Sequence, residues 1–367
     1  MSLSLAVRAG RRFVNPLRAL AFASLALPAA AAGLPADLGE RLAGGYVRPA
    51  AAALREAAAG MEQTLAGWCG KRDAAGARAV GDAFARLATA WSGVEFLRFG
   101  PLVQGNRYER LVFWPDARGV MPRQVRALLA EQDAALLAPG ALAARSVAVQ
   151  GLPALEYTLY GEPALLAEPQ APAAAYACGY ARAVAANVAA ISAEVDEAWR
   201  PGADFGRQFA RPEPGNALYR DAQEVAAEAV KSLSTGLQFA RDIKLLPTLG
   251  QDPASARPRR AAFWRSGLAL RTLSAGLDGM RAFYEAGRYP LPEASAWIGD
   301  SVRGELARAA RALREAPPDI EAALASAEGW RAVNLAAVTL KNAKAIVDQD
   351  LAPAVGVTIG FNALDGD

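Results

Sequence analysis

Apolar residues recur every three or four positions along most of this 367-residue chain. One such stripe consists of Val47, Ala51, Leu54, Ala58, Met61, Leu65 and Trp68. After Asp73, a possible N-cap, a second stripe consists of Val80, Phe84, Leu87, Trp91 and Val94. This spacing places apolar side chains on one face of an amphipathic helix. We therefore predict an all-α fold, in which these two helices form an antiparallel hairpin that ends by Gly100-Pro101.

Proline and glycine separate the remaining periodic segments. Further helices are predicted at 122–137, 147–160 and 172–195, and then at 218–243, 261–286, 294–315 and 319–350. The Pro- and Gly-rich stretch 201–215 predicts a linker. It would separate an N-terminal four-helix-bundle-like domain, 33–200, from a C-terminal one, 216–367. Residues 355–361 alternate in polarity, which predicts a short strand or an extended closing segment.

The first 32 residues have the pattern of a cleavable secretory signal peptide. Four arginines precede an apolar run at 19–27, and four alanines follow at 29–32. This order of charge, apolar core and small residues is typical of export signals. We therefore predict a periplasmic protein and leave the route, Sec or twin-arginine, open. No later stretch is long and charge-free enough to predict a transmembrane helix.

Removal of the signal changes the charge balance. Four of the 40 basic residues lie in the signal, so the mature chain carries 36 basic residues against 37 acidic ones. A net charge near zero gives no reason to expect a nucleic-acid partner.

The chain contains two cysteines, Cys69 and Cys178. An even number of cysteines in an oxidising compartment favours a disulfide. The alternative is a pair of separate buried thiols. We predict the disulfide because each cysteine lies near a predicted helix end, where two bundle helices can meet.

The chain contains no histidine. The usual general base and the commonest zinc ligand are therefore absent, which excludes a Ser-His-Asp triad, a Cys-His pair and a His-based zinc site. A carboxylate site for iron or another divalent cation stays open.

Four segments stand out from the helical background. In the first, Glu95 and Arg98 are three apart, a spacing at which they can pair on a helix surface. The second contains Gly151 and Glu156, with a proline between them at a helix start. The third is the charged segment Arg241-Asp242-Ile243-Lys244 at a predicted helix end. The fourth is the polar tail from Gly360 to Asp367.

These segments resemble motifs of imelysin-like proteins, which carry a G-x-H-x-x-E motif followed by an aromatic residue. Gly151, Glu156 and Tyr157 fit that frame, and Pro153 occupies the histidine position. Further matches are Trp91 before Gly100-Pro101, Asn106-Arg107 before Trp114-Pro115-Asp116, and the terminal Gly360-Phe361-Asn362 with Asp365-Gly366-Asp367.

The resemblance implies two helical-bundle domains packed around a central cleft, an envelope location and a link to iron supply. It also implies a peptidase that holds a metal through histidine and glutamate. Proline offers no donor atom, so we expect the peptidase function to be absent. The residues that the resemblance and the four segments nominate for ligand binding are Glu95, Arg98, Gly151, Glu156, Tyr157, Arg241, Asn362 and Asp365. Glu156 is expected to pair with Arg98 or Arg241.

The leading hypothesis is a non-catalytic envelope protein that binds a small ligand, a metal complex or a partner protein in the cleft, with a link to iron acquisition. The alternative is a carboxylate-based metal-dependent hydrolase or an iron-binding protein. A third hypothesis is a scaffold protein, which extensive surface apolarity would favour.

Overall fold

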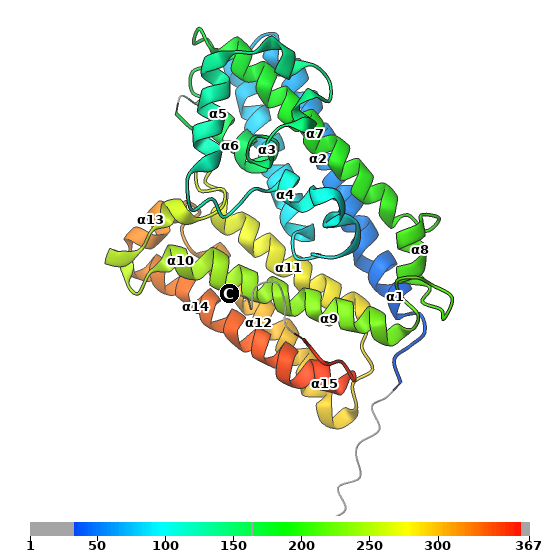
Figure 1. The fold of residues 1–367 in the computed structure, drawn as a ribbon. Coiled ribbons are helices and arrows are strands. Elements are labelled where there is room, and N and C mark those ends of the chain that lie inside the picture. Colours follow the sequence, from blue (N-terminus) through cyan, green and yellow to red (C-terminus); the bar gives the residue numbers. More distant parts are fainter. Residues whose placement is uncertain (1–32, 163, 361–367) are drawn as a thin grey trace, which may run out of the picture. The chain divides into compact units, whose positions relative to one another are not determined.

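The computed structural model describes residues 33–162 and 164–360, and within these ranges every regular element is helical (Figure 1). The predicted all-α fold is therefore confirmed. The described residues belong to one compact unit. The predicted signal peptide, 1–32, and the tail beyond Gly360 lie outside the described residues.

The predicted N-terminal hairpin is confirmed. Helix α1 (Leu38–Leu42) continues through a π-helical turn (Ala43–Val47) into α2 (Arg48–Cys69), which packs against α3 (Ala74–Val94) and α7 (Ala174–Trp199). All seven residues of the predicted α2 stripe are at most 4% exposed. The Asp73 carboxylate accepts a hydrogen bond from the Gly76 amide at 2.6 Å, which caps α3 as predicted.

Between α3 and α7 the chain forms short elements. These are 3₁₀ turns at Gly100–Leu102 and Gln104–Asn106, α4 (Arg107–Leu111), α5 (Val120–Glu131), 3₁₀ turns at Ala134–Leu137, Ala141–Ala144 and Val147–Val149, and α6 (Leu152–Tyr160). The helix predicted at 122–137 ends at Glu131 because Gln132 adopts a left-handed backbone, with φ 53°. The helix predicted at 147–160 begins only at Leu152. Pro153 lies in its first turn, where a backbone N–H would have no acceptor within the helix, so its absence costs no hydrogen bond.

The predicted linker contains a helix, α8 (Asp204–Ala210). Its Phe209 is fully buried and packs against the rings of Phe99, Trp199 and Tyr219. Residues 201–215 are thus not an extended connection, and the division into two domains stays a prediction.

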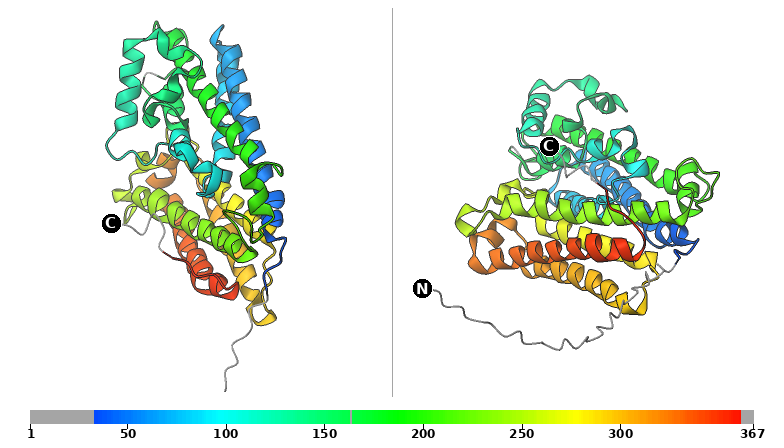
Figure 2. Two further views of the ribbon diagram at one scale, coloured as in Figure 1. Left: turned by 45° about the vertical axis from the view of Figure 1, so that its right-hand side comes forward. Right: turned by 60° about the horizontal axis from the view of Figure 1, so that its bottom comes forward.

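The C-terminal helices follow in sequence order. They are α9 (Ala222–Gln238), a π-helical segment (Phe239–Leu245), α10 (Leu246–Leu249), α11 (Ala269–Gly287), α12 (Ala296–Glu315), α13 (Ile320–Ala325), α14 (Ala327–Ile346), a π-helical turn (Val347–Leu351) and α15 (Ala352–Ala354). Short 3₁₀ turns lie at Pro253–Ser255, Pro258–Arg260 and Glu293–Ser295. Helices α11, α12 and α14 pack in succession, and α9 lies beside α14 (Figure 2).

Two predictions in this region were wrong in detail. The helix predicted at 261–286 begins only at Ala269, because residues 261–268 form turns that include Phe263 at φ 57°. The helix predicted at 319–350 divides at Ser326, whose hydroxyl accepts from the Gly329 amide and caps α14. The described end of the chain, 357–360, has no regular secondary structure, so the predicted short strand does not form there.

Glycines allow the N-terminal helices to approach α11 closely. A Cβ atom on Gly279 would lie 2.4 Å from the Tyr46 hydroxyl and 3.3 Å from the Gly93 Cα. Tyr46 in turn donates a hydrogen bond to the Gly93 carbonyl at 2.6 Å. This contact leaves no space for a larger side chain at position 279.

No helix within the described ranges combines the length and apolarity needed to span a bilayer.

Cys69 at the end of α2 and Cys178 in α7 form a disulfide, with their Cα atoms 5.7 Å apart. The bond closes a loop of 109 residues and joins two helices of the N-terminal set. A cross-link over so long a loop restricts the unfolded chain strongly.

We predict that the double variant Cys69→Ala/Cys178→Ala unfolds with a free energy about 2–4 kcal/mol lower than that of the oxidised wild type. Urea denaturation of both proteins measures this difference. Wild-type protein treated with a reductant is the control and should match the double variant. Equal stability of all three samples would contradict the prediction.

Candidate functional site

A large pocket in the described part of the chain has a volume of about 530 Å³. Small-molecule sites typically measure roughly 300–1,000 Å³. Four stretches of chain form its walls: the loop from α4 to α5 together with the start of α5, the helix α6, the π-helical segment with α10, and the turns before α11. Its lining includes Trp114, Asp116, Pro153, Glu156, Ile243, Pro247, Arg259, Arg260, Phe263, Trp264 and Arg265.

Glu156 on α6 lines this pocket and is 3% exposed. Its Oε1 atom accepts hydrogen bonds from the Ser266 amide at 2.9 Å and from the Ser266 hydroxyl at 2.7 Å. Burial raises the pKa of the Glu156 carboxyl, while the Ser266 hydrogen bonds and the Arg265 charge oppose that rise. The expected pairing of Glu156 with Arg98 or Arg241 is therefore wrong.

Pro153 lines the same pocket one helical turn before Glu156. It supplies no donor atom, and one Glu156 oxygen, Oε1, already accepts two hydrogen bonds from Ser266. Within residues 33–162 and 164–360, no three His, Cys, Asp or Glu side chains lie close enough together to hold a metal ion. The residues present in this pocket thus do not fit the metal that the peptidase motif implies.

A basic and aromatic segment, 259–265, forms one wall of the pocket. The Arg265 guanidinium lies 4.6 Å from the centre of the Trp264 ring and 5.1 Å from that of Tyr157. The Arg259 guanidinium also lies over the Trp264 ring, 5.3 Å from its centre. Arg259 forms an ion pair with Glu321 at 2.8 Å. Stacking of guanidinium groups on aromatic rings fixes both partners in place.

The sequence pattern did not predict this wall, because residues 261–268 were assigned to a helix. The signal that could have revealed it is Arg257-Pro258-Arg259-Arg260, a proline within a cluster of arginines. Proline disfavours a helical residue before it, so this cluster is better suited to a turn.

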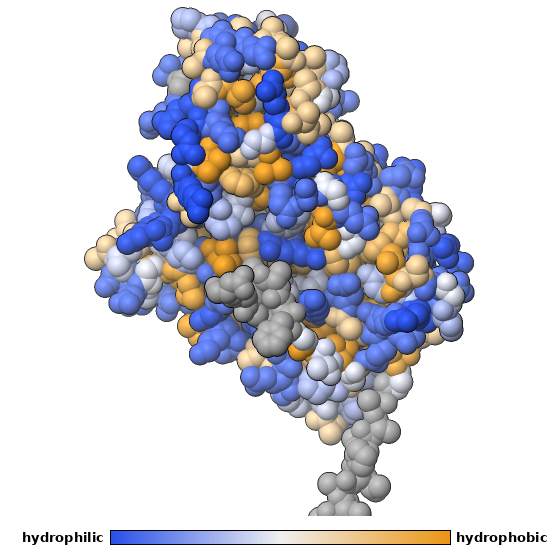
Figure 3. All heavy atoms as spheres, viewed as in Figure 1, coloured by the Kyte–Doolittle hydropathy of each residue, from blue (hydrophilic) through white to orange (hydrophobic). Residues whose placement is uncertain are grey.

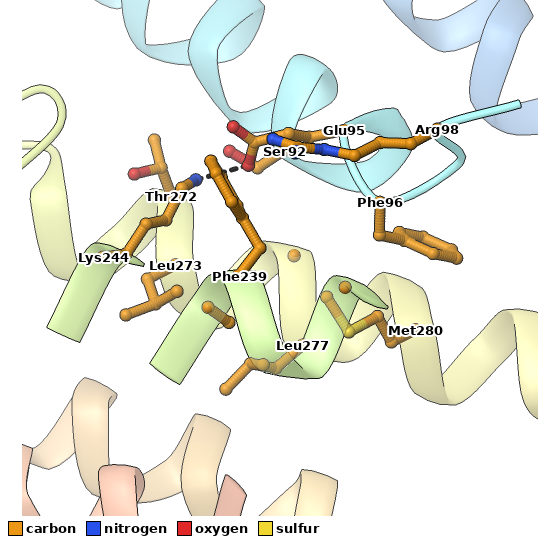
Figure 4. Close-up of a pocket in the computed structure, with 13 residues that line it drawn as sticks. Ser92, Glu95, Phe96, Arg98, Phe239, Lys244, Thr272, Leu273, Leu277 and Met280 are labelled. Carbon is orange, nitrogen blue, oxygen red and sulfur yellow. Dashed lines mark hydrogen bonds and ion pairs between the residues drawn. The ribbon is translucent and has the colours of Figure 1, made fainter. Parts of the chain in front are cut away.

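A second group of predicted residues surrounds a smaller pocket of about 20 Å³ (Figure 4). That volume has room for about one water molecule. Glu95 and Arg98 line it, but the surface pair predicted between them does not form. Helix α3 ends at Val94, and the buried carboxylate of Glu95 forms an ion pair with Lys244 instead.

Arg98 contacts aromatic rings. Its guanidinium lies 4.3 Å from the ring centre of Tyr108 and 3.7 Å from that of Phe239, and it donates a hydrogen bond to the Tyr108 hydroxyl. In Figure 4 the Glu95 and Arg98 side chains lie above the π-helical segment that carries Phe239 and Lys244. This cluster joins the end of α3 to the C-terminal helices.

The remaining predicted site residues have different positions. Gly151 is buried at the start of α6, where a Cβ atom would lie 2.2 Å from the Leu111 carbonyl oxygen. Tyr157 is buried near Arg265. Arg241 forms an ion pair with Asp242. Asn362 and Asp365 lie outside the described residues.

The structure therefore brings the predicted residues into two groups. Glu156 lines the large pocket and Tyr157 contacts its Arg265, whereas Glu95 and Arg98 line the small one. A third hollow lies between these pockets. It shares the lining residue Lys244 with the small pocket, and it shares Ala261 and Ala262 with the large one.

We predict that Lys244→Met lowers the free energy of unfolding by about 3–5 kcal/mol, since it leaves the Glu95 carboxylate buried without a partner. The double variant Glu95→Gln/Lys244→Met should recover part of that loss. Urea denaturation of the two single variants and the double variant gives the coupling energy. A coupling energy near zero would show that the pair contributes nothing to stability.

We also predict a pH dependence from Glu156. Because its folded pKa is raised, the unfolded chain ionises first as the pH rises above about 4.3. Wild-type stability relative to Glu156→Gln should therefore fall with rising pH, by at most about 1.4 kcal/mol per pH unit, until the folded pKa is passed. Denaturation of both proteins across this range provides the measurement. A difference that stays constant or grows with pH would contradict the assignment.

Comparisons with known proteins agree with this architecture. The imelysin family model matches residues 47–347. No curated protein matches the chain. An imelysin-like protein from Psychrobacter arcticum 273-4 has a similar solved structure, with a TM-score of 0.71 and 19% identity, covering 90% of this chain and 99% of that one.

An iron-regulated protein A precursor from Parabacteroides distasonis ATCC 8503 is also similar, with a TM-score of 0.67 and 13% identity over 87% of this chain and 96% of that one. At these identities the two structures show a shared fold. The family model covers most of the chain, so the protein belongs to the imelysin family.

Proposed function

We propose that this chain is an exported, non-catalytic member of the imelysin family that binds a small organic ligand in the pocket around Glu156. The observation that carries the proposal is the pocket of about 530 Å³ in which Pro153 takes the place of the motif histidine. A concave site of this size, with aromatic walls and a few buried polar groups, is typical of ligand binding.

The residues of the pocket support binding rather than hydrolysis. The peptidase motif needs a histidine nitrogen and a free carboxylate on one metal ion. Position 153 has no donor, and one Glu156 oxygen, Oε1, already accepts two hydrogen bonds from Ser266. No other histidine exists in the sequence to replace the lost ligand.

Three further observations support an envelope location and a link to iron acquisition. The first 32 residues have the composition of an export signal. One structural neighbour is named as an iron-regulated protein precursor. The disulfide also suits an oxidising compartment.

The surface gives less support to a scaffold role. On the face shown in Figure 3, apolar and hydrophilic residues are interspersed rather than gathered into one apolar area. Partner-binding surfaces are more often marked by a contiguous apolar patch.

We predict that small organic compounds raise the melting temperature of the mature protein and that Ala117→Trp abolishes this effect. Ala117 is exposed and lines the pocket, so a tryptophan there would fill the space without disturbing the core. A thermal-shift screen of a chemically mixed compound library provides the measurement.

Ala66→Trp on the exposed surface of α2 is the matched control and should respond to ligands as the wild type does. The same samples, incubated with unfolded protein substrates, should release no peptides. Ligand shifts that survive in the Ala117 variant would contradict the proposed site, and peptide release lost in Glu156→Gln would contradict the non-catalytic assignment.

A further inference from the structure

The acidic side chains that line the large pocket have hydrogen-bond donors within the protein, whereas two of its arginines form no ion pair among the residues that the structure describes. Its acidic members are Asp116 and Glu156, and its basic members are Arg259, Arg260 and Arg265. Both oxygens of Asp116 accept backbone hydrogen bonds at the start of α5, from Val120 at 2.9 Å and from Met121 at 2.8 Å. Glu156 accepts two hydrogen bonds from Ser266. The acids thus already have donors within the protein.

Of the three described arginines that line the pocket, one forms an ion pair with a carboxylate. Arg259 forms an ion pair with Glu321. Neither Arg260 nor Arg265 forms an ion pair within the described part of the chain, although both line the pocket. Arg265 is held by its contacts with the rings of Tyr157 and Trp264. The pocket therefore presents two guanidinium groups that form no ion pair within the described residues, although the Arg265 charge acts on the Glu156 carboxyl in the same pocket.

The pocket is also lined by aromatic rings. Trp114, Phe263 and Trp264 line the pocket together with Pro115, Pro122 and Pro153. Phe263 has a left-handed backbone, with φ 57°, which is rare for a bulky side chain and tends to occur where a ligand site requires it. Aromatic faces favour flat, unsaturated ligand bodies.

We infer that the pocket binds an organic anion with a flat, unsaturated body, whose carboxylate or equivalent acidic group is recognised by Arg260 and Arg265. This inference rests on the proposed function and specifies the ligand class. A guanidinium group presents paired N–H donors in a plane, which match the two oxygens of a carboxylate. The aromatic walls contact the rest of the molecule.

The test compares two probes of the same shape and different charge, naphthoate and its neutral amide. Titration of the mature protein, followed by calorimetry and tryptophan fluorescence, gives both affinities. Naphthoate should bind at least about tenfold more tightly than the amide, because a charge-assisted pair contributes more than a neutral hydrogen bond. Raising the salt concentration should reduce that ratio.

Arg260→Gln is the main variant, since Arg260 is exposed and its replacement leaves the core intact. It should lower naphthoate affinity about tenfold and leave amide affinity within about twofold. Arg265→Gln should act in the same direction. Arg257→Gln removes the same charge three residues earlier, from an exposed position that does not line the pocket, and should change neither affinity.

Equal affinity for the two probes would overturn the inference, as would an Arg260 variant that behaves like the Arg257 control. If both probes bind equally and Ala117→Trp abolishes both, the pocket is a ligand site of another specificity and the proposed function stands. If neither probe binds, the inference is wrong, and the thermal-shift screen alone then decides whether the pocket binds ligands at all.

Discussion

The contact between Glu156 and Ser266 determines how the turns before α11 lie against α6. A buried carboxylate must be hydrogen-bonded, because an unpaired one has a large desolvation cost. Ser266 provides both its amide and its hydroxyl to one oxygen of Glu156. This pairing holds the preceding residues, Arg259 to Arg265, against the start of α6 and so creates the wall of the pocket. The carboxylate that a peptidase motif would give to a metal has a structural partner here.

A second buried contact joins the end of α3 to the π-helical segment, 239–245. Lys244 and Glu95 form an ion pair that is almost entirely shielded from solvent, and Arg98 is enclosed by Tyr108 and Phe239. Buried ion pairs add little net stability when the desolvation of both charges is counted. Their strict geometry instead favours one arrangement of the packed helices. The close approach of Gly93 and Gly279 imposes a similar constraint through packing.

The sequence predicted the parts of this fold that depend on local periodicity. The apolar stripes of α2 and α3 and the Asp73 cap agree with the structure, because burial of one helix face follows a regular spacing. The Glu95–Arg98 pair was wrong, because α3 ends at Val94 and the partner of Glu95 comes from a segment 149 residues away. Glu156 was found through its motif. Arg260, Trp264 and Arg265 were not, because residues in turns show no periodicity and their position depends on the Ser266 contact.

Pro153 and the Ser266 contact leave the pocket without the ligands that a metal needs, a conclusion that metal uptake by the purified protein can contradict. Calorimetric titration of the mature protein with zinc and ferrous ions, together with elemental analysis of the purified samples, tests it most directly. Wild type and Glu156→Gln should both take up metal at well below one equivalent and should not differ. Uptake of one equivalent by the wild type, lost in Glu156→Gln, would contradict the account and restore Glu156 as a metal ligand.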